Sequence, residues 1–119
     1  MKRTNKLGLL KRKADKLFQI KYIPEKPFSI VSGKPTEVLH HFIPKSQSNN
    51  LRYDPRNGIP LTNAEHFAHH TVGDPTILMT IEKNLGKDTV DYLQEARRMI
   101  CTINIGYLND IIEKLQCQQ

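Results

Sequence analysis

The spacing of apolar positions changes along the chain, and each spacing predicts a different kind of element. Over residues 5–20, apolar side chains recur every three or four positions and lysines fill the opposite face, which predicts an amphipathic helix. The pairs Ile23-Pro24 and Lys26-Pro27 then predict a break in the chain. The apolar stripe of this helix consists of Leu7, Leu10, Ala14, Leu17 and Phe18.

The middle of the chain has the composition of short strands joined by loops. Residues 28–33 predict a short strand that runs into a turn, and residues 37–43, which are β-branched, aromatic and bracketed by prolines, predict a second one. Residues 44–58 form a long polar loop, which is uncommon in a small domain unless the loop has a function. Residues 59–61 predict a further strand, and Pro60 places it at a sheet edge.

Helical patterns return after this strand. Thr62 and Glu65 have the spacing of a capping box, so we expect a helix that begins here, runs to about His70 and stops before Gly73. Asp74-Pro75 starts the next helix and Gly86 ends it. Two more helices follow, one starting near Asp88. Their apolar stripes are expected to be core: Ile77, Leu78, Ile81 and Leu85; Val90, Leu93, Ala96 and Ile100; Leu108, Ile111, Ile112 and Leu115.

These elements predict an α+β fold in one compact domain, which 119 residues can form. We divide it into a basic N-terminal helix or arm (1–22), a strand-and-helix core (23–73) and a helical extension (74–119). No apolar run is long enough for a membrane span or the core of a signal peptide. Cys101 and Cys117 form no Cys-x-x-Cys pair, so a reduced, intracellular setting is expected and a disulfide scaffold is not.

Positive charge is concentrated at the N-terminus. Residues 1–22 hold eight Lys or Arg and one Asp, a net charge of +7, whereas residues 23–119 carry a net charge of −1. A basic arm on a nearly neutral body favours a polyanionic partner, either nucleic acid or an anionic membrane surface. The alternative is a solvated helix face that only aids solubility.

All five histidines lie within 31 residues, at positions 40, 41, 66, 69 and 70. His66 and His70 are four residues apart, so on a helix their imidazoles share one face and form a pair of metal ligands. His40 could supply a third ligand from the strand, which leaves His41 for a different task. Phosphodiester hydrolysis needs this division, because a metal neutralises the phosphate while a neutral histidine activates water.

The runs Leu39-His40-His41-Phe42-Ile43-Pro44 and Arg52-Tyr53-Asp54-Pro55-Arg56-Asn57-Gly58-Ile59-Pro60-Leu61, followed by His66 and His70, resemble the HNH endonucleases. These enzymes belong to the ββα-metal (His-Me finger) superfamily. The resemblance is strongest to phage NinG-type recombination nucleases, and the order of histidines is also similar to that of colicin-type DNases. The motif covers residues 29–70, and the basic helix and helical tail extend the likeness to the phage group.

The resemblance implies a role for each matching position. His41 would be the general base, and His40, His66 and His70 would be the metal ligands. Asn57 would brace the loop and thereby position His41, although Asn57-Gly58 is also an ordinary turn dipeptide. Contacts with the nucleic acid would come from Arg52, Arg56, Lys45, Lys11, Arg12 and Lys13.

The chain departs from the family pattern at the structural zinc knuckle that many HNH domains carry. The matching positions are Ser29, Ser32, Thr62 and Glu65, which make a poor tetrahedral zinc site. We therefore expect one divalent ion per chain, Mg²⁺, Mn²⁺, Zn²⁺ or Ni²⁺, and no structural zinc. Three imidazoles favour the softer of these ions, whereas the family is often supported by Mg²⁺.

Three details of the site stay open at this level. Adjacent strand residues point to opposite faces, so His40 and His41 serve one site only if the strand ends, twists or bulges there. His69 is an alternative to His70 as a ligand. Glu37 and Asp54 are candidates for hydrogen bonding to a histidine.

The sequence thus supports a metal-dependent DNA endonuclease of low sequence specificity or of structure selectivity, phage-derived and acting in the cytoplasm of a bacterial host in recombination or DNA processing. The first alternative is a non-catalytic nucleic-acid-binding module with a structural metal. The second is an HNH subunit of a phage packaging or recombination assembly that docks through its C-terminal helices. DNA is the expected partner of the endonuclease, and no membrane partner is expected. The sequence carries no dimer signature.

Overall fold

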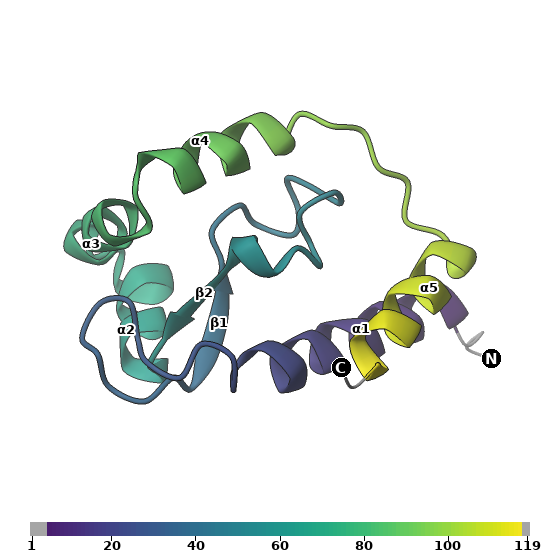
Figure 1. Ribbon diagram of the computed structural model, residues 1–119, viewed down its shortest axis with the longest axis horizontal. Coiled ribbons are helices and arrows are strands. Elements are labelled where there is room, and N and C mark those ends of the chain that lie inside the picture. The colour runs from purple at the N-terminus through teal and green to yellow at the C-terminus, as the bar shows by residue number, and fades with distance from the viewer. Residues whose placement is uncertain (1–4, 118–119) are drawn as a thin grey trace.

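A computed structural model describes residues 5–117 and has an α+β architecture (Figure 1). Lys2 and Arg3 of the basic arm lie outside the described residues. The elements, in chain order, are α1 (Lys6–Tyr22), β1 (Val38–His41), the 3-10 turn η1 (Pro55–Asn57), β2 (Gly58–Leu61), α2 (Asn63–Phe67), the π-helical turn η2 (Ala68–Val72), α3 (Pro75–Leu85), α4 (Lys87–Ala96) and α5 (Ile105–Gln116). Within the described part, no helix is both long enough and apolar enough to cross a membrane.

The sheet consists of β1 and β2, which pair antiparallel with Val38 opposite Leu61 and His41 opposite Gly58. Both strands were expected. The loop predicted over residues 44–58 ends one residue earlier, at Asn57, because Gly58 already has an extended backbone and belongs to β2. Pro60 lies in β2 without breaking the ladder, because it is opposite Leu39 in a pair that exchanges no hydrogen bonds, so its missing N–H is not needed there. Its carbonyl points outward and accepts a hydrogen bond from the Ile30 amide.

The strand predicted for residues 28–33 is wrong. This segment makes only an isolated bridge between Phe28 and Pro35 and otherwise folds as a tight turn. The Ser29 hydroxyl accepts hydrogen bonds from the amides of Val31 and Ser32, and Gly33 has a φ of 75°. Local side-chain hydrogen bonds of this kind compete with strand pairing.

The apolar core is divided into three clusters around the sheet. The first joins α1, β1 and α5; the second joins the loop after β1 to α4; the third joins β2 to α3. Figure 1 shows the consequence, with α5 lying beside α1 at one end of the molecule and α3 and α4 at the other. The largest side chains that are fully buried are Phe18, Leu39, Leu51, Ile59, Leu61, Ile81, Leu93 and Leu108.

Two of the predicted core positions are exposed. The prediction of a fourth apolar residue in α4 is wrong, because α4 ends at Ala96 and Ile100 is 98% exposed. Leu78 of α3 is also exposed. The chain leaves its helix at this point because residues 97–104 must cross from α4 to α5 at the opposite end of the molecule (Figure 1).

Helix α1 is docked on the free edge of β1 by one side chain. The Gln19 amide donates to the Leu39 carbonyl at 2.9 Å, and its oxygen accepts from the Leu39 amide at 2.8 Å. Leu39 faces Pro60 in the sheet, so its own polar backbone groups point away from β2 and need partners. Gln19 supplies both, which fixes α1 beside the residue that precedes His40.

Phe18 fixes the same helix under the face of the sheet. A Cβ on Gly58 would lie 3.1 Å from the Phe18 ring, which is tighter than an ordinary van der Waals contact, so the ring would have to move aside by a few tenths of an ångström. We predict that Gly58→Ala destabilises the fold by about 1–3 kcal/mol through overpacking. Urea unfolding followed by circular dichroism measures the change. Gly106→Ala in α5, where a Cβ meets nothing closer than 3.5 Å, is the control and should be neutral or stabilising.

A polar contact ties α4 to the turn before β2. Asp54 accepts hydrogen bonds from the Tyr92 hydroxyl and from Arg56, whose guanidinium lies 3.6 Å over the Tyr92 ring. Burial alone would raise the pKa of Asp54, but the hydrogen bonds from Tyr92 and Arg56 outweigh it and lower the pKa. Its ionised form therefore stabilises the folded state.

We predict that this contribution is fully present above the ordinary Asp pKa and is lost as the pH falls through the lower pKa of the folded state. Native protein should be more stable than Asp54→Asn at neutral pH, and the gap should close in acid. The difference between the urea midpoints of the two proteins, measured from pH 7 down to pH 3, gives this gap in stability. Tyr92→Phe removes one hydrogen bond to the carboxylate and should make the gap smaller. A gap that does not depend on pH would contradict the role of the carboxylate.

Candidate metal and catalytic site

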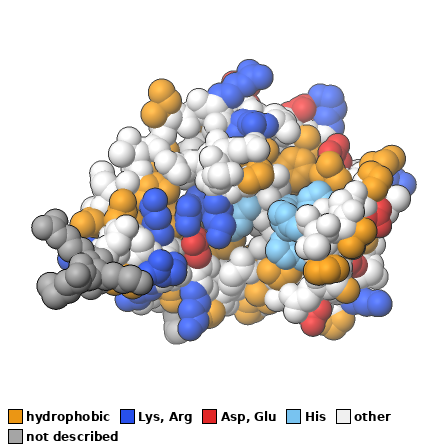
Figure 2. Space-filling view, turned by 180° about the vertical axis from the view of Figure 1, so that it is seen from behind, with side chains coloured by type: hydrophobic (Ala, Val, Ile, Leu, Met, Phe, Trp, Pro, Cys, Tyr) orange, Lys and Arg blue, Asp and Glu red, His pale blue; other side chains and the backbone are white. Residues whose placement is uncertain are grey.

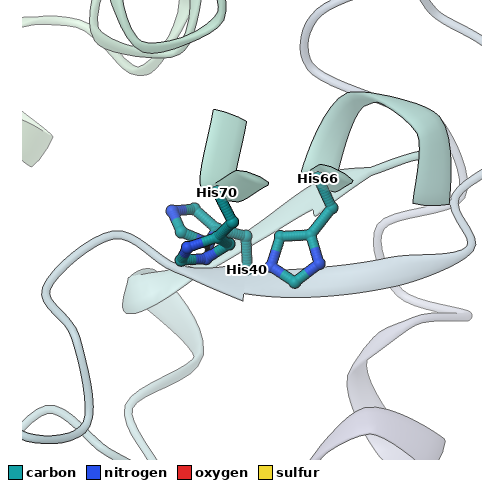
Figure 3. Close-up of side chains that lie close together, drawn as sticks. All are labelled: His40, His66 and His70. Atoms are coloured by element: carbon teal, nitrogen blue, oxygen red, sulfur yellow. Dashed lines mark hydrogen bonds between the residues drawn. The ribbon is translucent and has the colours of Figure 1, made fainter. Parts of the chain in front are cut away.

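Three histidines converge beside the sheet, His40 from β1, His66 from α2 and His70 from η2 (Figure 3). Their nearest ring nitrogens all lie within 4.8 Å of one another, and Nε2 of His70 is 3.1 Å from Nδ1 of His40. Three imidazole nitrogens in this arrangement are close enough to bind one metal ion. Among residues 5–117 no other group of three His, Cys, Asp or Glu side chains is as close together.

The helix that carries two of these histidines starts and ends with identifiable contacts. The predicted capping box is present: Thr62 accepts from the Glu65 amide at 3.1 Å, and Glu65 accepts from the Thr62 amide at 2.8 Å. The α-helix lasts only to Phe67 and then widens into the π turn η2, which ends at Gly73 with a φ of 75°. The helix predicted to stop before Gly73 is therefore present, but its second half, Ala68–Val72, is π-helical, which the sequence did not predict.

The π turn brings a fourth histidine near the group. The ring centroid of His69 is 4.9 Å from that of His40, about the same as the 4.8 Å between His70 and His40. His69 is nevertheless not part of the group whose nitrogens meet within 4.8 Å. Single π turns inside helices are rare and often occur at functional sites.

The surroundings of two of these rings, those of His40 and His66, favour the neutral form. Burial, together with the neighbouring His66 and His70, lowers the pKa of His40 to about 3. Burial and His70 also lower the pKa of His66. Neutral imidazole is the form that binds a metal, so the rings are held ready for a cation without having to lose protons. The donor set of three nitrogens suits Zn²⁺, Ni²⁺ or Mn²⁺ and leaves positions for other ligands.

The histidine group lies at one end of an open cleft of about 770 Å³ between α1 and the helix after β2. His41 lines the same cleft, together with α1 residues that include Asp15, Lys16 and Gln19. On the face seen in Figure 2, the histidines are flanked by a group of Lys and Arg side chains with an acidic side chain among them. The cleft thus joins a candidate metal centre to a basic surface.

His41 has a different environment from the other histidines. Its Nε2 lies 2.8 Å from the Arg52 carbonyl oxygen, and its ring stacks on Phe18 with the centroids 5.4 Å apart. A carbonyl only accepts, so Nε2 carries the hydrogen and the neutral ring keeps its lone pair on Nδ1. Burial lowers the pKa of His41, although the bond to the Arg52 carbonyl opposes this.

The adjacent positions of His40 and His41 do place their side chains on opposite faces of β1. His40 faces α2 and η2, whereas His41 faces α1 and its Phe18. Both still line one cleft, because β1 is an edge strand that ends at His41 and the cleft wraps around that edge. No bulge is needed.

Asn57 is completely buried at the end of the long loop. Its side-chain oxygen accepts from the Ile43 amide at 2.7 Å, and its Nδ2 donates to the carbonyls of Ile43 and Leu51. Its own carbonyl accepts from the Phe42 amide. These bonds join the two ends of the loop, Ile43 and Asn57, which are 14 residues apart. They also hold Asn57 against Phe42, the residue that follows His41 at the end of β1.

The expected nucleic-acid contacts fall into three groups. Lys45 lines the cleft and is 3.7 Å from Asp15. Arg52 is paired with Asp15 and has a side chain only 16% exposed, while Arg56 is exposed but lies on Asp54 and Tyr92, away from the cleft lining. On α1, Arg12 and Lys13 are exposed and Lys11 is half-buried.

The remaining candidate positions have structural partners. Ser29 donates to Glu65 at 2.6 Å, so the positions matched to the zinc knuckle hold a hydrogen-bonded cluster at the start of α2. Glu37 accepts from the Asn63 amide, and Asp54 bonds Tyr92 and Arg56, so neither carboxylate bonds a histidine in these contacts. Gln19, Lys16 and Asp15 were not predicted as site residues, because nothing in their spacing shows which face of α1 meets the cleft.

Comparison of the chain with protein-family models, with curated proteins and with solved structures finds no match.

We predict that the metal-stripped protein binds one Zn²⁺ or Ni²⁺ per chain and that binding raises its unfolding temperature. An ion at 100 times its Kd would add about 2.7 kcal/mol to the stability of the folded state. His66→Ala should abolish the shift, whereas His69→Ala, the matched control one position from His70, should retain it. Calorimetric titration gives the stoichiometry, and an equal loss in both variants would contradict the assignment of ligands.

Proposed function

We propose that this protein is a metal-dependent endonuclease of the HNH, ββα-metal (His-Me finger) type that hydrolyses phosphodiester bonds in DNA. One observation carries the proposal: three imidazoles that can hold a metal ion and a fourth imidazole with a free nitrogen line one cleft beside a basic helix. The order of elements, β1, β2 and then the helix with His66 and His70, is the order that the resemblance implies.

The chain supplies a base of the right kind. His41 is neutral, and its Nε2–H is occupied by the Arg52 carbonyl, so Nδ1 is the atom that accepts a proton from water. His40, His66 and His70 would hold the divalent ion, which supplies charge that stabilises the phosphate and the leaving oxygen. Asn57 holds the segment that follows His41 at the end of β1, and so keeps the base in place.

The basic residues provide affinity without a sequence code. Lys45 and Lys16 line the cleft, and Arg12 and Lys13 extend the positive surface along α1. Lysine and arginine side chains bind the phosphates of the DNA backbone, which are the same for every base sequence. Cleavage should therefore have low sequence specificity or select a DNA structure, which suits a role of phage origin in recombination or DNA processing.

We predict metal-dependent nicking of plasmid DNA by the metal-stripped chain after addition of Mg²⁺, Mn²⁺, Zn²⁺ or Ni²⁺. His41→Ala should lower the rate by roughly 10²–10⁴-fold, as expected for loss of a general base, while its calorimetric metal affinity stays native. His69→Ala is the matched histidine control and should cleave at the native rate. Native rates in His41→Ala would refute the assignment of the base.

A second candidate is a non-catalytic DNA-binding module with a structural metal. The closeness of His69 to His40, 4.9 Å between centroids, favours it, since a fourth imidazole would close the coordination shell. Tight DNA binding with no cleavage in any metal would support this candidate, or a subunit that docks into a larger assembly through its C-terminal helices.

A further inference from the structure

Asp15 is the only acidic residue in α1, a helix with six Lys or Arg between Lys6 and Tyr22, and it lines the cleft. A carboxylate is an unfavourable neighbour for a phosphodiester, because two negative charges repel each other in a partly desolvated cleft. Its place there needs a reason other than binding of the substrate.

The first part of the reason is a two-pronged ion pair. Oδ1 of Asp15 accepts from Nε of Arg52 at 3.1 Å, and Oδ2 accepts from a terminal guanidinium nitrogen at 2.7 Å. The side chains of Asp15 and Arg52 are 22% and 16% exposed. Bidentate pairing fixes the plane of a guanidinium as well as its position, which a single contact does not.

Arg52 also contacts His41 through its backbone. The Arg52 carbonyl accepts the hydrogen bond from Nε2 of His41 at 2.8 Å. The neighbouring Leu51 carbonyl is held by Asn57 and the Arg52 amide donates to the Asn49 carbonyl. The loop thus fixes the Arg52 peptide on one side. Asp15 fixes the Arg52 side chain against α1, next to Tyr53, whose hydroxyl donates to the Lys11 carbonyl of the same helix.

We propose that Asp15 is a positioning residue for His41. It holds Arg52 so that the Arg52 carbonyl stays on Nε2, which keeps the His41 hydrogen on Nε2 and the lone pair on Nδ1. This inference rests on the proposed function, in which His41 is the general base, and deepens it. It also assigns Arg52 to this chain of contacts instead of to phosphate binding.

The proposal separates two kinetic effects that an ordinary charge in the cleft would not separate. If Asp15 acted only through its charge on the substrate, Asp15→Asn would tighten DNA binding and leave kcat unchanged. If Asp15 positions His41, Asp15→Asn should lower kcat by roughly 10- to 100-fold, the size seen for partners that orient histidines, with KM for DNA equal to or below the native value. Asp15→Glu, which keeps the carboxylate, should recover part of kcat.

A double-mutant cycle tests whether the effect passes through Arg52. Arg52→Met removes the guanidinium and keeps the backbone carbonyl. Asp15→Asn combined with Arg52→Met should be no slower than Arg52→Met alone, because both changes break the same contact. Additive losses of kcat would overturn the proposal. Asp91→Asn, which breaks the exposed pair of Asp91 with Lys87, is the ion-pair control and should leave kcat unchanged.

A measurement on the metal-free protein tests the inference without any cleavage. Nitrogen NMR of ¹⁵N-labelled histidine should show one His41 tautomer in the native chain, with hydrogen on Nε2, and a mixture of tautomers in Asp15→Asn. An unchanged single tautomer in Asp15→Asn would overturn the proposal. If the native chain cleaves no DNA in any metal, the proposed function fails, and the tautomer result still decides the role of Asp15.

Discussion

The docking of α1 against β1 is the contact on which the arrangement of the cleft depends. Two consecutive residues of α1 make it by different physical means. Gln19 satisfies the outward-facing amide and carbonyl of Leu39, which would otherwise need water at a half-buried edge. Phe18 fills the space that Gly58 leaves free and stacks on His41. The same helix turn therefore positions the strand that carries His40 and the ring face of His41.

Separate faces of β1 give its two histidines separate chemistry. His40 is buried against His66 and His70, and desolvation keeps it neutral. His41 is on the α1 side, where the Arg52 carbonyl occupies one nitrogen. A ring whose Nε2 is held by a carbonyl has only one nitrogen, Nδ1, left to accept a proton. The alternation of side chains along β1 therefore gives the two adjacent histidines different environments.

The elements formed by neighbouring residues could be predicted from the sequence. The capping box at Thr62, the start at Asp74-Pro75 and the apolar stripe of α5 each depend on residues within one or two helical turns. The approach of His66 and His70 followed from their spacing, and His40 joined them because β1 and β2 pair in a short antiparallel ladder. The segment 28–33 was misread because hydrogen bonds to Ser29, which propensity does not count, outweigh its β-branched composition.

Contacts between distant residues could not be predicted, and they decide how the site works. Asp15 and Arg52 are 37 residues apart, Gln19 and Leu39 are 20 apart, and no periodicity joins either pair. The resemblance implied that Arg52 contacts phosphate, but a bidentate carboxylate partner takes up its guanidinium. Lys45, which is more exposed and only 3.7 Å from the same carboxylate, remains beside the cleft. Charge near this site is thus divided between a cation that holds the loop and cations that face solvent, and only the folded structure determines which is which.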